Sequence, residues 1–469
     1  MIKIIIFVRL NIFIMSIKGL ISVYGRWISA AAAAVMIGSC STFPEDDLYP
    51  DISHNDRNGS ERYPDRNSED SRNNVFIVYS MGYNNLSYDL NEDIDEMLSG
   101  YVPSFHMKDD AVLIFNHSTV RNSSNYKTKT SPVLYKAYRA GDGELKRDTL
   151  VVYPEGSVGA SKEMFGKVLT YIKENFPAEH YGMLVSSHAT GWAPRMYCYN
   201  PPDKSSSHYY GSQQKEFRPL EKYTDERPLT RSIGAHFNGS ASNMDEIELQ
   251  DFADAIPFHL DYLLFDCCFM GGVEVAYQLK DKCDRICFSQ TEILSGGMDY
   301  KYLLSHLLER ETPDLGAIAL DYYNMYANEV SENLRSATVS VVDCRKTEKL
   351  ASIIARYADD IYYLGKSYTR NSVQRYFQSR YSEEHGIFFD LEHILVKSFA
   401  TEEDLAELRK ALDECIECKY ATETFLTNLE IQHHSGLSMY LPDIEREILN
   451  DYYKTLEWNK ATGIIPDKE

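Results

Sequence analysis

Residues 75–345 alternate between short apolar runs and longer amphipathic segments. Short apolar runs between turn residues are typical of buried strands, and apolar positions three and four residues apart are typical of helices. We expect buried strands at residues 75–80, 111–116, 182–187, 262–265, 285–290 and 337–343. We expect helices at residues 86–98, 161–176, 245–255, 273–279, 300–309, 312–330 and 347–364. The alternation predicts an α/β fold, a three-layer α/β/α sandwich with a mainly parallel sheet. Residues 133–138 and 149–153 predict an antiparallel pair at a sheet edge.

Reactive side chains follow two of these strands. The run at 262–265 ends in Asp266, Cys267 and Cys268, just before the helix expected at 273–279. A thiol at a helix N-terminus has a lowered pKa, although both cysteines would also suit a small place in the core. His188 follows the run at 182–187. A single histidine there is more often structural, but parallel strands end at one edge of a sheet, so His188 and Cys268 could meet.

Five segments together resemble the clostripain-like family of cysteine peptidases, which have a caspase-like fold. In chain order they are residues 75–86 with Tyr83-Asn84-Asn85-Leu86, 176–192 with His188-Ala189-Thr190-Gly191-Trp192, 265–274 with Phe265-Asp266-Cys267-Cys268-Phe269-Met270-Gly271, 289–300 and 436–442. They cover nearly all of residues 75–445. Two positions depart from the family pattern: Ala189 stands where Gly is usual, and Cys267 stands where Ala is usual. The first departure bears on the oxyanion hole, because a Gly can adopt φ > 0.

The resemblance implies a cysteine endopeptidase that uses a Cys–His dyad, with Cys268 as the nucleophile and His188 as the base. The backbone N–H groups of Cys268 and Ala189 would form the oxyanion hole. Cleavage after Arg or Lys is implied as well. Asp266 would supply the matching carboxylate, and Asp299 is a second candidate. The other interpretation of Asp266 is a strand-end residue that orients its loop.

The resemblance also bears on activation and metals. Related enzymes are often activated by their own cleavage after a basic residue between His and Cys, and the basic, exposed insertion expected at 195–243 would suit this. Calcium dependence occurs in the family. We find no calcium ligand set in the sequence and expect no cofactor or metal. The acidic residues of helix 86–98 are interpreted as a solvated face rather than a calcium loop, because they follow a helical period without a central Gly.

The N-terminus predicts a bacterial lipoprotein, and Glu45-Asp46-Asp47 resembles the acidic signal that sends some Bacteroidetes lipoproteins to the cell surface. Residues 1–39 have the charged and apolar regions of a signal peptide, and Ile37-Gly38-Ser39-Cys40 resembles a lipobox in which Cys40 is lipidated. An ordinary signal peptide or a membrane anchor is the alternative. Residues 40–74 predict a disordered tether. We expect a lipid-anchored protein of the cell envelope, in the outer membrane and, given the acidic residues 45–47, at the cell surface.

Charge and cysteine content narrow the classes of partner. The chain has a formal net charge of -22, which argues against nucleic acid and suits cationic substrates. Its nine cysteines do not have the spacing of a disulfide framework. Cys415 and Cys418 are interpreted as structural, because no second pair with zinc-ligand spacing accompanies them.

We therefore expect a peptidase domain at residues 75–345 and a C-terminal α+β part, residues 346–469, packed on it. The expected substrates are peptides or proteins with basic residues. Two other hypotheses remain open. One is a catalytically inactive surface lipoprotein that uses the same fold for binding. The other is hydrolysis of a different amide, since Cys–His chemistry does not select its acyl donor.

Overall fold

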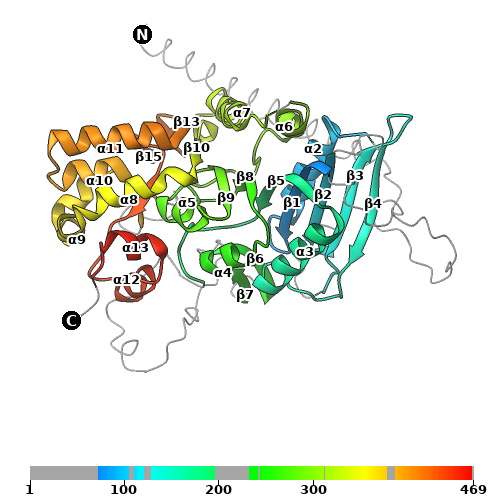
Figure 1. Cartoon of the computed structure of the whole chain (residues 1–469), viewed down its shortest axis with the longest axis horizontal. Helices are drawn as coiled ribbons and strands as arrows, with labels where there is room; N and C mark the ends of the chain where they lie inside the picture. Colours follow the sequence, from blue (N-terminus) through cyan, green and yellow to red (C-terminus); the bar gives the residue numbers. More distant parts are fainter. Residues whose placement is uncertain are drawn as a thin grey trace, which may run out of the picture. The chain divides into compact units, whose positions relative to one another are not determined.

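A mixed sheet of nine strands runs through the described part of the chain, in the order β13-β10-β9-β8-β5-β1-β2-β3-β4 (Figure 1). The computed structural model describes residues 72–104, 110–120, 128–195, 232–240, 243–310, 312–377 and 386–466. The five strands from β9 to β2 are parallel, and the strands at both edges are antiparallel. The expected sheet is thus confirmed, including the antiparallel pair β3–β4 at one edge. The bounds are β1 (Arg72–Gly82), β2 (Asp110–Ser118), β3 (Val133–Arg139), β4 (Leu145–Val152), β5 (Ala178–Ser186), β8 (Leu260–Asp266), β9 (Cys283–Phe288), β10 (Thr338–Asp343) and β13 (Ile416–Ala421).

Helices cover both faces of this sheet, which makes the expected three-layer sandwich. Alternate residues of a strand point to opposite faces, and in β1 the side chains of Val75 and Ile77 belong to one buried cluster while Phe76 and Val78 belong to another. The first cluster includes the helices α3 (Lys162–Asn175), α4 (Leu249–Ala255), α5 (Val273–Leu279) and α8 (Thr347–Ala355). The second includes α2 (Ser87–Ser99), α6 (Tyr300–Leu308) and α7 (Leu315–Ala327). The predicted cap of α3 is also confirmed, because the Ser161 side chain accepts a hydrogen bond from the Met164 N–H.

Two expectations about the middle of the chain need correction. The helix expected at 245–255 begins only at Leu249, because the residues before it form a hairpin of β6 (Ile233–Ser240) and β7 (Asn243–Ile247). We expected residues 195–243 to form an exposed insertion. This is wrong for the end of that segment, because residues 232–237 are buried. Ile233 and Phe237 supply buried apolar side chains, which the prediction from the polar composition of the segment missed. Residues 196–231 lie outside the described residues, as do the signal peptide and Cys40.

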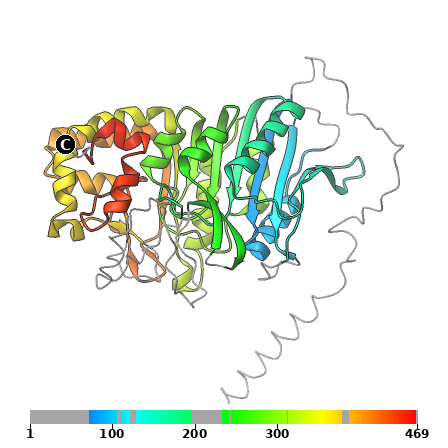
Figure 2. The ribbon, with the colours of Figure 1, turned by 90° about the horizontal axis from the view of Figure 1, so that it is seen from below.

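The C-terminal residues complete the same sheet. Strand β13 pairs with β10, and α11 (Glu402–Cys415) leads directly into it. The helix expected at 347–364 is two helices, because α8 ends before Arg356 and α9 (Ala358–Gly365) begins after Tyr357, whose φ of -113° is not helical. Figure 2 shows the C-terminal helices at one end of the sheet and β3–β4 at the other. The remaining elements are η2 (Glu332–Leu334), η3 (Cys344–Lys346), η4 (Tyr368–Ser372), β11 (Arg375–Tyr376), β12 (Phe388–Asp390), α10 (Leu391–Lys397), β14 (Thr424–Phe425), β15 (Leu429–Glu430), β16 (Ser438–Tyr440), α12 (Glu447–Tyr453) and α13 (Glu457–Thr462).

No helix within the described ranges is both long enough and apolar enough to span a membrane.

Candidate active site

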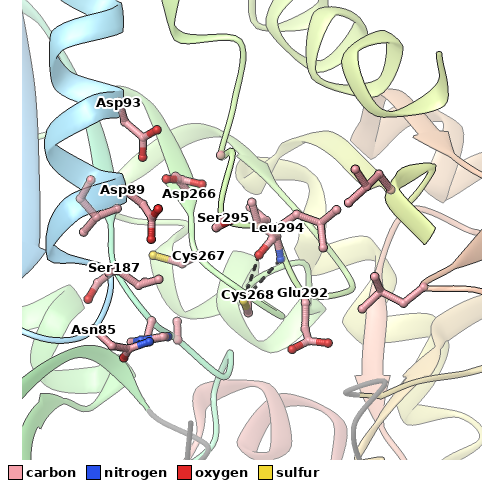
Figure 3. Close-up of a pocket in the computed structure, with 18 residues that line it drawn as sticks. Asn85, Asp89, Asp93, Ser187, Asp266, Cys267, Cys268, Glu292, Leu294 and Ser295 are labelled. Atoms are coloured by element: carbon pink, nitrogen blue, oxygen red, sulfur yellow. Dashed lines mark hydrogen bonds between the residues drawn. The ribbon is translucent and has the colours of Figure 1, made fainter. Parts of the chain in front are cut away.

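The two reactive side chains lie at matching positions on neighbouring strands. Strands β5 and β8 are parallel, and their last paired residues are Ser186 and Asp266. His188 and Cys268 each follow two residues later, so the register brings them to the same edge of the sheet. Both line one pocket of about 380 Å³ (Figure 3). The expectation that these residues meet at the carboxyl ends of parallel strands agrees with this arrangement.

The adjacent cysteines occupy different environments. Cys267 is 1% exposed, and its thiol donates to the Val185 carbonyl at 3.4 Å. Burial raises the pKa of Cys267 well above its ordinary value, so it stays a neutral thiol in the core. Cys268 is half-buried, and its Sγ accepts the Ile293 N–H at 3.3 Å while its thiol donates to the Ile293 carbonyl at 3.8 Å. The next residue, Phe269, has φ of 59°, a strained value for a bulky side chain and one found at functional turns.

Asn85 contacts the imidazole of His188. Its Oδ1 lies 2.9 Å from His188 Nε2. An amide oxygen only accepts, so this contact is a hydrogen bond when Nε2 of His188 carries a proton. The preceding residue, Asn84, is fully buried and fixes this loop: its amide donates to the carbonyls of Met81 and Ala235, and its Oδ1 accepts the Leu86 N–H. Sequence reasoning noticed the Asn84-Asn85 pair as a motif but gave neither residue a role.

The hairpin β6–β7 sets the direction of the peptide group between His188 and Ala189. Gly234 N–H donates to the His188 carbonyl at 2.9 Å, and Ala189 forms a bridge with Ile233. In a planar trans peptide the N–H points opposite to the carbonyl, so the Ala189 N–H points away from Gly234. Ala189 itself lines the pocket. It has no positive φ, whereas Gly191 has φ of 56°, so the glycine-requiring conformation falls at 191 rather than 189.

Asp266 is buried in the pocket wall. It is 6% exposed, and its Oδ2 accepts hydrogen bonds from Tyr300 at 2.7 Å and from Ser186 at 3.1 Å. Burial raises the pKa of Asp266, and these two hydrogen bonds oppose that rise. Gly297 permits the close packing around it: a Cβ there would lie 2.8 Å from the Tyr300 ring and 3.4 Å from Asp266 Oδ2.

Two further carboxylates from α2, Asp89 and Asp93, line the same pocket (Figure 3). Asp93 is 7% exposed, and its Oδ2 has no hydrogen-bond partner among the described residues. Burial raises the pKa of Asp93 well above its ordinary value, and the nearby charge of Asp266 raises it further. Our interpretation of the α2 acids as a solvated face is therefore wrong for Asp93. The available signal was its spacing, three residues after Leu90 and thus beside the apolar stripe.

Asp299, the second candidate for the pocket acid, lies elsewhere. It is the residue before α6 and is not among the residues that line the pocket. Burial raises the pKa of Asp299, with a further contribution from the charge of Asp321. Its own charge raises the pKa of Glu96 on α2. Asp266 and Asp299 are thus not brought together around one cavity, and the carboxylates that share the pocket with Asp266 are those of Asp89, Asp93 and Glu292.

A buried glutamate connects the Cys268 loop with the C-terminal residues. Glu274, in the first turn of α5, is 1% exposed, and its Oε1 accepts the Tyr440 N–H at 2.7 Å and the Tyr453 hydroxyl at 2.8 Å. Burial raises the pKa of Glu274 to about 7, and these hydrogen bonds oppose the rise. The Ser438 N–H donates to the Gly271 carbonyl at 2.8 Å. The loop that carries Cys268 therefore rests on β16 and α12.

Across the described ranges, no group of three or more His, Cys, Asp or Glu side chains is placed to hold a metal ion. Calcium dependence stays an expectation from the family resemblance.

Comparison with known proteins identifies the family to which this chain belongs. The sandwich fold and its matches define a cysteine peptidase with a caspase-like architecture. The sequence profile of the clostripain family matches residues 222–463, more than half of the chain. The protein belongs to the clostripain family. A comparison with curated proteins gives no match.

Three solved structures share the fold. A secreted C11 cysteine protease from Bacteroides thetaiotaomicron has 23% identity and a TM-score of 0.63, over 84% of this chain and 99% of that one. A structure of such a protease from the same species, with an irreversible peptide inhibitor, has 20% identity and a TM-score of 0.62, over 83% and 99%. An inactive zymogen C11 protease from Parabacteroides distasonis has 22% identity and a TM-score of 0.62, over 84% and 98%.

Proposed function

We propose that Cys268 and His188 form the catalytic dyad of this cysteine peptidase and that it cleaves after Arg or Lys. The observation that carries the proposal is the shared register of β5 and β8, which sets both side chains two residues beyond the Ser186–Asp266 pair. Both residues line a pocket that also holds four carboxylates, those of Asp89, Asp93, Asp266 and Glu292. A nucleophile, a base and a charge-selective wall thus lie around one cavity.

The reaction uses the thiol as a nucleophile. His188 Nδ1 takes the proton of Cys268, and the sulfur attacks the carbonyl carbon before the scissile bond. His188 then gives the proton to the leaving amine, and water hydrolyses the thioester to regenerate the thiol. Asn85 holds the Nε2–H of His188, which leaves Nδ1 as the basic nitrogen. Once Cys268 has lost its proton, the Ile293 N–H remains as a hydrogen-bond donor to Sγ.

The oxyanion forms on the carbonyl oxygen of the substrate. We propose the backbone N–H groups of Ala189 and Cys268 as its donors. The direction of the Ala189 N–H, away from the hairpin that binds the His188 carbonyl, supports this assignment. The side chain of Ala189 does not prevent it, since the backbone there has no positive φ.

A basic substrate side chain would complete the carboxylate wall. Asp93 has a buried oxygen without a hydrogen-bond partner among the described residues, and a guanidinium or ammonium group supplies such a donor. The carboxylates repel one another when ionised, so a cation between them removes that repulsion. A bidentate contact favours Arg over Lys. The net charge of -22 adds long-range attraction for cationic peptides.

We also propose that the enzyme is activated by its own cleavage between His188 and Cys268, and that Cys40 anchors it by a lipid to the outer membrane. The basic residues of 195–231 support the first proposal, together with the description of one neighbour as an inactive zymogen. The lipobox-like residues 37–40 support the second, and one neighbour is described as secreted. Calcium is added to the assays, because the family resemblance includes it.

The decisive experiment measures hydrolysis of fluorogenic peptides that carry Arg, Lys, Ala or Glu before the bond. We expect turnover of the Arg and Lys peptides and a loss of at least about 10³-fold in Cys268→Ala or His188→Ala. Cys267→Ala is the matched control and keeps activity within about threefold, because its thiol is in the core. Wild-type protein should also yield two fragments on incubation, and Cys268→Ala a single band. Equal turnover by wild type and Cys268→Ala, or cleavage only of non-basic amides, would contradict the proposal.

A further inference from the structure

The pocket has a second wall of different chemistry. Leu86 and Leu90 line it beside the α2 acids, and a second group of leucines, Leu294, Leu334 and Leu426, lines it as well; we call this second group the apolar wall. Leu294 follows β9, Leu334 ends η2, and Leu426 follows β14. In Figure 3, Leu294 and Glu292 lie to the right of Asp93 and Asp266. One cavity therefore holds both carboxylates and aliphatic side chains, and the apolar wall comes from other elements than the three aspartates.

The apolar wall packs partly on a small core and, through Leu294, on the second large core of the sandwich. Leu294 and Leu426 pack against a buried cluster of Phe377, Phe425 and Leu429. This cluster is separate from the two large cores of the sandwich. Leu294 and Leu426 are only partly buried by it, so apolar surface remains exposed toward the pocket. Exposed apolar surface beside a catalytic centre is typical of a binding subsite.

Two hydrogen bonds connect Leu426 to the segment that carries Leu334. The Leu426 N–H donates to Ser336 Oγ at 2.8 Å, and Thr427 Oγ1 donates to Asn333 Oδ1 at 3.1 Å. Leu426 has φ of 47°, a conformation that L residues with bulky side chains rarely adopt. Leu334 is 43% exposed and still lines the pocket. The turn after β14 thus keeps Leu426 beside Leu334 at the expense of backbone strain.

We propose that the apolar wall is a second specificity subsite, which takes an aliphatic side chain of the same peptide whose basic side chain enters the carboxylate wall. The inference rests on the proposed function, because it needs a peptide across Cys268. An acidic side chain in this pocket would be repelled by Asp89, Asp93 and Asp266. An aliphatic side chain loses contact with water against three leucines and needs no hydrogen-bond partner. The preferred peptide therefore carries Leu or a similar residue next to its basic residue.

The test compares peptides that keep Lys before the scissile bond and carry either Leu or Ala at one neighbouring position at a time. We expect wild type to favour Leu about tenfold in kcat/KM at one position, the lower end for an aliphatic pocket that is open on one side. This ratio should fall to about two in Leu334→Ala and in the double variant Leu334→Ala/Leu426→Ala. The preference for Lys over Ala before the scissile bond should stay unchanged. Leu320→Ala on α7 is the matched control, an exposed leucine away from the pocket.

A wild-type Leu/Ala ratio near one at every position, or a ratio that the double variant retains, would overturn the inference. Thermal unfolding of each variant separates loss of the subsite from loss of the fold, and the exposed Leu334 carries the test if Leu426→Ala unfolds. A second measurement separates the inference from the proposed function. Binding of the same labelled peptides to Cys268→Ala is followed by fluorescence anisotropy, so it needs no turnover. Tighter binding of the Leu peptide that Leu334→Ala removes supports the subsite even without hydrolysis, and equal binding overturns it.

Discussion

Asp93 of α2 and Asp266 of β8 face one pocket, and the charge of Asp266 raises the pKa of Asp93. Both carboxyl groups are more than nine-tenths buried. Ser186 and Tyr300 donate hydrogen bonds to Asp266, whereas Asp93 Oδ2 has no partner among the described residues. Buried carboxyl groups that interact in this way hold protons at a pH at which an exposed aspartate would be ionised. A bound cation is the partner that would ionise both.

The first prediction concerns substrate choice. We expect Asp93→Asn and Asp266→Asn to lower kcat/KM for Lys and Arg peptides at least about tenfold, because a neutral amide leaves the substrate cation without its counter-charge. Asp95→Asn is the matched control, since Asp95 is an exposed acid on the same helix and pairs with Arg147. Peptide kinetics with Lys and with an uncharged residue check it. An equal loss for both peptides would instead indicate damage to the catalytic groups.

The second prediction concerns pH. Because the pKa values of Asp93 and Asp266 are raised, the free pocket carries protons that a cationic side chain must displace. KM for a Lys peptide should therefore fall as pH rises above the ordinary aspartate value of 3.8 and toward the raised pKa of Asp93. Asp93→Asn should flatten this dependence. Steady-state kinetics from about pH 5 to 8.5 measure it. A KM that is constant over this range in wild type contradicts the prediction.

The third prediction concerns the orientation of His188. Asn85→Ala removes the acceptor at Nε2, so the ring loses its fixed tautomer, and we expect kcat to fall about tenfold with little change in KM. Asn85→Asp supplies an acceptor again and adds a negative charge. It should restore part of kcat and move the His188-dependent limb of the pH profile upward, because a nearby carboxylate favours imidazolium. A purely structural role for Asn85 would leave the pH profile in place.

The fourth prediction concerns the residue after the histidine. Ala189→Gly should leave kcat/KM within about threefold, because residue 189 has no positive φ and its N–H is present in both forms. The variant should lose about 0.5–1 kcal/mol of stability, since glycine has more freedom to lose on folding. Kinetics and thermal unfolding measure the two effects. A large gain in kcat would show that Ala189 impairs the oxyanion hole.

The fifth prediction concerns Glu274, whose pKa is raised from 4.5 to about 7 by burial. A raised carboxyl pKa means that the folded state keeps a proton that the unfolded state releases. Its contribution to stability is therefore fully present below pH 4.5 and is lost as pH rises through about 7, by up to about 3 kcal/mol. Glu274→Gln, which still accepts from Tyr440 and Tyr453 through its oxygen, should show a weaker fall of the melting temperature between pH 5 and 8. An unchanged slope would assign the pH dependence to other groups.

Much of the fold can be predicted from local sequence patterns. The apolar runs of β1, β2, β5, β8 and β9 and the stripes of α2, α3 and α6 have periods that only a buried strand or an amphipathic helix satisfies. The hairpin β6–β7 escaped prediction because Ile233–Ser240 follows a long polar segment, and composition outweighed a few apolar positions. The break between α8 and α9 escaped because the apolar period continues across Tyr357.

The candidate site likewise has a part that the sequence predicts and a part that depends on long-range packing. The sequence by itself determined that His188 and Cys268 follow strands, and that parallel strands end at one edge. Tertiary structure alone decided which other groups surround them. Whether Asp93 faces water or the pocket, and whether Leu334 and Leu426 line the same pocket, depends on how α2 and the C-terminal turns pack, with contacts between residues far apart in the chain. Periodicity tells which side of an element is apolar, but it does not tell what lies opposite, and the pKa of a carboxyl group depends on its surroundings.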